Sequence, residues 1–144
     1  MRFPAPQPGL VVRYGFLWSH ERHAGVDEAS KDRPCAIVVA TSRGASGEIV
    51  VVVSPITHRP PDDLSGSIEM PAAVCRALGL DAGRHWLRLE ELNRFVWPGF
   101  DLRPIPGRPG EVAYGMLPQA LFERLREGIL TRQKVRRVKV QGRE

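Results

Sequence analysis

The sequence has few cysteines and no long apolar run. Only two of its 144 residues are cysteines, Cys35 and Cys75, and their separation lacks the CxxC pairing of zinc or redox sites. We therefore predict two separate buried thiols. The longest strongly apolar stretch, residues 49–53, is strand-sized and falls far short of the roughly 20 residues that span a bilayer. The N-terminus has no apolar signal segment, so we expect a cytoplasmic protein without a membrane span.

Motifs for nucleotide and metal chemistry are also missing. The chain has no GxxxxGK loop, no GxGxxG after a strand and no GxSxG elbow. The pair His20 and His23 lacks a clear third ligand. We therefore predict no metal site and no cofactor.

The positive charge is concentrated at the C-terminal end. The net charge is +5, and residues 132–144 hold six of the 21 basic residues and one of the 16 acidic residues, which leaves 15 of each in residues 1–131. Net charge alone therefore does not indicate nucleic-acid binding by the folded part. We predict one domain over residues 1–131, followed by a basic, flexible tail over 132–144.

The distribution of apolar residues, prolines and glycines indicates short strands and one helix near the C-terminal end. The 13 prolines and 14 glycines imply many turns, whereas 42% hydrophobic and 26% charged residues are typical of a globular chain. The helix at 118–128 is indicated by Leu117, Leu121 and Leu125, which recur every four residues, with Phe122 and Ile129 widening the apolar face. We expect a short helix from Pro71 to Leu78 and a polar loop at 19–32. Strands are expected at residues 10–18, 35–40, 48–54, 67–70, 85–89 and 94–97.

This order predicts a mainly β fold. The strands are short and irregularly spaced, and only one longer helix follows them. A small curled or barrelled sheet with a C-terminal α-helix fits this pattern better than a doubly wound fold.

Four segments resemble the MazF/PemK family of toxin ribonucleases. They are, in chain order, PGLVV at 8–12, KDRP leading into AIVV at 31–39, VVSPIT at 52–57 and IEMP at 68–71. With the terminal helix included, the resemblance extends from about Pro8 to Leu130. It implies an SH3-like barrel that forms a homodimer, cleaves single-stranded RNA without a metal and is neutralised by an antitoxin protein.

Two positions match the catalytic positions of that family. Arg33, at the start of the second strand, resembles the family's catalytic arginine, and Thr57, at the end of the third, resembles its active-site threonine. RNA cleavage by attack of the 2′-OH on the neighbouring phosphate requires stabilisation of growing phosphoryl charge and transfer of two protons. A guanidinium suits the first task, and its pKa above about 12 makes it a poor base. The Thr57 hydroxyl is suited to orient the phosphate or the 2′-OH.

The proton carrier stays open between two histidines. His58 follows Thr57, and His20 begins the long loop before Arg33. A histidine titrates near neutral pH and so suits proton transfer, but in an extended strand His58 and Thr57 point to opposite faces unless the chain turns there. The remaining candidates are substrate-binding positions: Glu21, Lys31, Arg59 and Trp97, the last as a possible surface for base stacking.

Two other functions fit parts of the sequence. A barrel that binds RNA or a protein partner without cleaving RNA has the same strand pattern. Residues 68–80 locally resemble the AbrB-type DNA-binding regulators, but that resemblance covers only a small part of the chain and has few cations for phosphate contacts.

Overall fold

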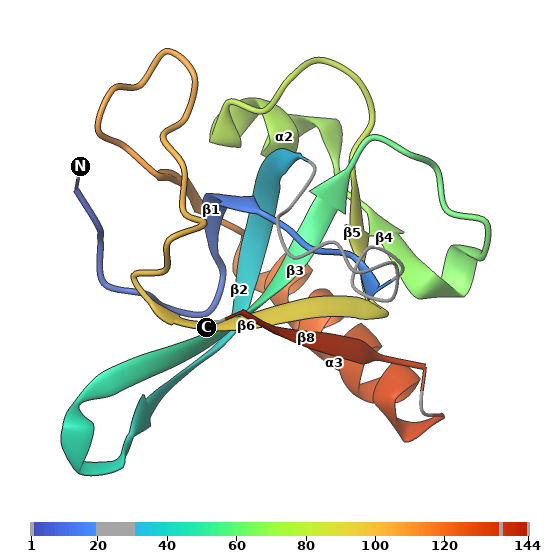
Figure 1. Ribbon diagram of the computed structural model, residues 1–144. Helices are drawn as coiled ribbons and strands as arrows, with labels where there is room; N and C mark the ends of the chain where they lie inside the picture. Colours follow the sequence, from blue (N-terminus) through green and yellow to red (C-terminus); the bar gives the residue numbers. More distant parts are fainter. Residues whose placement is uncertain (1, 20–30, 136, 144) are drawn as a thin grey trace.

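The computed structural model describes residues 2–19, 31–135 and 137–143. It is mainly β, with a strongly curled antiparallel sheet that forms a half-barrel and a helix near the C-terminal end, as predicted (Figure 1). The strands are β1 (Leu10–Gly15), β2 (Asp32–Arg43), β3 (Glu48–Thr57), β4 (Ser67–Glu69), β5 (Trp86–Arg88), β6 (Glu91–Trp97), β7 (Ala113–Met116) and β8 (Lys139–Arg143). The helices are α2 (Ala72–Leu78) and α3 (Gln119–Lys134), with 3-10 turns η1 (Gly44–Ser46) and η2 (Leu64–Gly66).

Strand β3 organises the sheet. One edge pairs with β2 from Glu48 to Pro55, whereas the other edge pairs first with β6 and then, at Ile56 and Thr57, with β5. The neighbouring strands of the curled sheet follow the order β4-β5-β3-β2-β1-β7. The far ends of β2 and β3 project from the half-barrel as a hairpin (Figure 1).

The prediction that Pro55 ends this strand is wrong. β3 continues through Pro55 to Thr57. Proline lacks only the backbone N–H, so it interrupts a ladder on one side of a strand and leaves its carbonyl available. Pro55 lies where β3 changes neighbour from β6 to β5, and Thr57 is thereby part of the sheet.

Two apolar clusters cover the two sides of the sheet. One joins α2 and α3 to the sheet and includes Leu78, Leu87, Leu121 and Leu125. The other surrounds Tyr14 and Phe95, whose rings stack with centroids 4.5 Å apart. The predicted apolar face of the terminal helix is confirmed, because its leucines and Ile129 are buried. The predicted pair of buried free thiols is confirmed as well.

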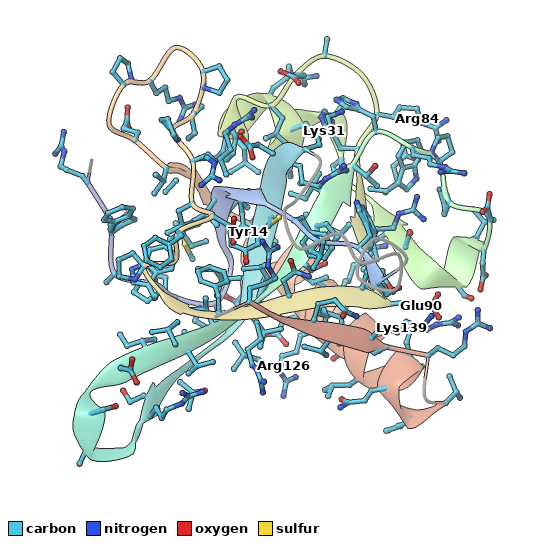
Figure 2. The ribbon with its side chains drawn as sticks, viewed as in Figure 1. Tyr14, Lys31, Arg84, Glu90, Arg126 and Lys139 are labelled. Atoms are coloured by element: carbon cyan, nitrogen blue, oxygen red, sulfur yellow. The ribbon has the colours of Figure 1, made fainter. Side chains whose placement is uncertain are left out.

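The C-terminal region is more structured than its composition predicts. The helix expected to end at Gly128 continues to Lys134, and Lys139–Arg143 forms β8 instead of an unstructured tail. β8 pairs in parallel with β6, and the Arg143 guanidinium lies 2.8 Å from the Asp101 carboxylate and 3.1 Å from the carbonyl of Gly15. The basic residues therefore provide an ion pair inside the fold. Figure 2 shows Lys139 beside Glu90, whose carbonyl accepts from the Lys139 N–H at 2.8 Å.

Other differences are smaller. β1 ends at Gly15 rather than at Trp18, and β7 is a strand that the sequence pattern did not predict. The predicted loop at 19–32 falls largely outside the described residues. Over the described ranges, no helix is both long enough and apolar enough to cross a membrane.

We predict that Leu125→Ala lowers the free energy of unfolding by about 2–5 kcal/mol, because it leaves a cavity where a fully buried side chain joins α3 to the sheet. Leu130→Ala, at a position of the same helix that is 43% exposed, should cost under about 1 kcal/mol. Urea unfolding of both variants measures the difference, and equal losses would contradict the packing described.

Candidate functional site

A cavity of about 960 Å³ opens where β2 begins and β3 ends. Its walls come from these two strands, the turn after β3, β5, the segment after α2 and the loop before β7. The residues that line it and bear on its chemistry are Arg13, Trp18, Ser19, Lys31, Asp32, Arg33, Thr57, His58, Arg59, Asp62, Asp81, His85, Arg88, Glu91 and Tyr114.

Strand register brings Arg33 and Thr57 to this cavity. Cys35 pairs with Pro55 across the antiparallel β2–β3 ladder. That pair ends the ladder, and Arg33 and Thr57 each lie two residues beyond it on their strands. Both residues line the cavity, so the arginine and the threonine selected by the sequence resemblance lie at one cavity.

A turn at the end of β3 brings His58 and Arg59 to the same cavity. The Thr57 hydroxyl accepts a hydrogen bond from the backbone N–H of Arg59 at 3.1 Å. Such a bond closes a local turn, which removes the strand alternation that separates neighbours. Thr57, His58 and Arg59 therefore all line the cavity. Thr57 is only 7% exposed, and its hydroxyl keeps one O–H for donation while its oxygen accepts from Arg59.

Arg88 adds a cation that the sequence analysis did not identify. Its guanidinium donates to the carbonyl of Arg59 at 3.1 Å, whereas its buried Nε has no hydrogen-bond partner among the described residues. Burial lowers the pKa of Arg88, the positive charges of Arg59 and Arg33 lower it further, and Asp62 opposes them. The positive charges of Arg59 and Arg33 thus act on Arg88, and an anion bound beside it would stabilise its charged form.

Most acidic side chains of the cavity have other partners. Asp32 lies 3.8 Å from Arg103, and both carboxylate oxygens of Glu91 accept from Ser19. Asp81 lies 3.9 Å from His58. Lys31, which Figure 2 shows just before β2, adds a further cationic side chain to the lining of the cavity.

Two imidazoles meet at one wall of the cavity. The rings of His58 and His85 have centroids 4.2 Å apart. His85 is 3% exposed, and the side chain of His58 is 47% exposed. Burial lowers the pKa of His85, and the neighbouring His58 lowers it further. The neutral form of His85 is therefore favoured.

The aromatic residues that line the cavity include Trp18 and Tyr114. The Arg33 guanidinium carbon lies 5.2 Å from the centroid of the Trp18 ring. Trp97 ends β6, packs on the cluster around Phe95 and is not among the residues that line this cavity. The structure therefore does not bring Trp97 to the other predicted site residues.

Of the eight predicted site residues, Lys31, Arg33, Thr57, His58 and Arg59 share the cavity. His20 and Glu21 lie outside the described residues. Arg88 and His85 were not among the predicted site residues, because both reach the cavity through the pairing of β5 with β3, which no local pattern indicates. Within the described part of the chain, no three His, Cys, Asp or Glu side chains gather as a metal site.

No model of a known protein family, no curated protein and no solved structure matches the chain. The geometry of the cavity is therefore the basis for the function proposed below.

The burial of His85 predicts a pH dependence of stability. Its pKa in the folded protein lies below the ordinary histidine value of about 6.5, so below that pH the unfolded chain takes up a proton that the folded chain does not. The free energy of unfolding should fall as the pH is lowered from about 7.5 to 5.5. His85→Phe should lose less stability over that interval, as measured by urea unfolding at both pH values. The same loss in both proteins would contradict this prediction.

Proposed function

We propose that this protein is a metal-independent endoribonuclease that cleaves single-stranded RNA, of the MazF/PemK type and with an SH3-like barrel. The observation that carries the proposal is that Arg33 and Thr57 line one cavity, each two residues beyond the last pair of the β2–β3 ladder. The sequence resemblance concerned their order along the chain, and the shared cavity adds support from the fold.

The reaction fits the groups in the cavity. The 2′-OH of the substrate attacks the adjacent phosphorus, the bond to the leaving 5′ oxygen breaks, and a 2′,3′-cyclic phosphate forms. Arg33 provides a planar fork of donors for the phosphoryl oxygens, whose charge grows in the transition state. Thr57 donates its O–H to the phosphate or the 2′-OH and so orients it.

The other cations suit a substrate with several phosphates. Arg59 and Arg88 lie beside Arg33 in the same cavity, and Lys31 lies just before β2. A chain of phosphates relieves the mutual repulsion of these side chains. Trp18 offers an aromatic ring for a base next to the Arg33 cation, the combination that binds unpaired nucleotides.

The biological setting is part of the proposal. In a toxin-antitoxin system, the ribonuclease acts as a homodimer and a cognate antitoxin protein neutralises it. The segment with local resemblance to AbrB-type regulators forms β4 and α2, and its Ile68, Met70 and Leu78 are buried in the core of this chain. This packing supports the ribonuclease over a DNA-binding hairpin.

We predict that the protein cleaves single-stranded RNA in the presence of EDTA and leaves a cyclic phosphate and a free 5′-hydroxyl. Arg33→Ala should lower the cleavage rate by about 100- to 1000-fold and Thr57→Ala by about 10- to 100-fold, because each removes a donor aimed at the reacting phosphate. Gel assays with end-group analysis of the products measure both effects.

Arg94→Ala is the matched control, since Arg94 is an exposed arginine on β6 and not among the cavity-lining residues. Its cleavage rate should equal that of the unaltered protein. Binding of RNA without cleavage would favour a binding module instead. Full activity of the Arg33 and Thr57 variants would exclude this site as the centre of cleavage.

A further inference from the structure

One five-residue segment surrounds the ring of His58. Residues 81–85 connect α2 to β5, and four of them approach the imidazole. The carbonyl of Arg84 lies 3.0 Å from Nδ1, and the Asp81 carboxylate lies 3.9 Å from Nε2. A Cβ placed on Gly83 would lie 3.6 Å from Nδ1, so the backbone passes close to the ring. His85 packs its own ring against that of His58.

The contact with Arg84 determines the tautomer of His58. A carbonyl oxygen only accepts hydrogen bonds, so Nδ1 must carry the hydrogen. In neutral His58 the lone pair is then on Nε2. That nitrogen is the one able to take a proton from a substrate.

An ion pair between Arg84 and Glu69, on the outer side of the sheet, holds the segment that carries the Arg84 carbonyl. The Arg84 guanidinium forms two hydrogen bonds of 2.7 Å with the two carboxylate oxygens of Glu69, and its carbon lies 4.8 Å from the Trp86 ring centroid. Glu69 and Trp86 are paired residues of β4 and β5. Figure 2 shows Arg84 on the outside of the molecule, in the segment before β5. Glu69 therefore acts on the backbone of the segment without lining the cavity.

His85 supports the ring from the buried side. Its backbone carbonyl accepts from the N–H of Met70 at 2.8 Å, which ties it to the end of β4. Besides Asp81 and the Arg84 guanidinium, the neighbouring charged side chains are Arg59, Asp62 and Arg88, which line the same cavity. Burial lowers the pKa of His85, so this ring packs against His58 in its neutral form.

We propose that Nε2 of His58 is the base that accepts the 2′-OH proton, and that Arg84, Glu69 and His85 are positioning residues that hold this nitrogen toward the cavity. The inference rests on the proposed ribonuclease function. In the step, the bond from O2′ to phosphorus forms, the bond from phosphorus to O5′ breaks, the 2′-OH proton moves to Nε2, and water protonates the leaving O5′.

The first experiment uses nitrogen NMR of the full chain labelled at histidine, without RNA. Neutral His58 should show the Nδ1–H tautomer, and Glu69→Ala and His85→Phe should each shift it toward a mixture of tautomers. The surface variant Glu123→Ala is the control, because it removes an exposed ion pair with Arg126 on α3. A predominant Nε2–H tautomer in the unaltered protein would overturn the positioning.

The second experiment measures steady-state cleavage of a single-stranded RNA across pH. His58→Gln should lower kcat by about 100-fold or more and remove the fall in rate at acidic pH. Glu69→Ala should lower kcat by about 3- to 10-fold with little change in KM, since it displaces the base and leaves the phosphate contacts in place. Because Glu69 is on the surface, this variant tests the inference even where His85→Phe does not fold.

The outcomes separate the two proposals. Normal kcat in His58→Gln, with Arg33→Ala inactive, would overturn the role of His58 and leave the ribonuclease standing. No cleavage by the unaltered protein would overturn both the ribonuclease and the base. The NMR result would then still decide whether residues 81–85 fix the tautomer of His58.

Discussion

The candidate site depends on one long strand that changes its neighbour. β3 pairs with β2 along nearly its whole length, and at Pro55 its other edge passes from β6 to β5. The β2 side carries Arg33, and the β5 side brings in His85 and Arg88. A one-residue shift of the β2–β3 register would turn Thr57 to the opposite face, so the chemistry of the cavity depends directly on this pairing.

Arg88 is the cation of the cavity on which the surroundings act most clearly. Burial lowers its pKa, and the positive charges of Arg59 and Arg33 lower it further. An anion bound beside Arg88 would oppose both effects. The same cavity holds a hydroxyl and two imidazoles, which are the groups a phosphate ester needs for orientation and proton transfer.

Local patterns predicted the parts of the fold that local physics decides. The leucine repeat of α3 and the glycine that ends α2 appear where the sequence indicates them, because helix periodicity and a left-handed cap involve only neighbouring residues. The full length of β3 did not follow from the sequence, because the effect of Pro55 depends on which strand lies on each side. Arg88 was missed for the same reason.

The sequence does not indicate which aromatic ring reaches the cavity, because the tertiary fold decides this. Trp18 lines the cavity, whereas Trp97 packs in the cluster around Phe95. β8 was not predicted, because residues 139–143 lie in a basic segment and pair with β6, 48 residues earlier in the chain.

The parallel pairing of β8 with β6 has a consequence for the folding kinetics. The β2–β3 hairpin closes over a few residues, whereas β8 pairs with a strand 48 residues earlier in the chain. Pairings that are distant in sequence cost more loop-closure entropy, so we expect β8 to join the sheet late and its amide hydrogens to exchange with solvent sooner than those of β3.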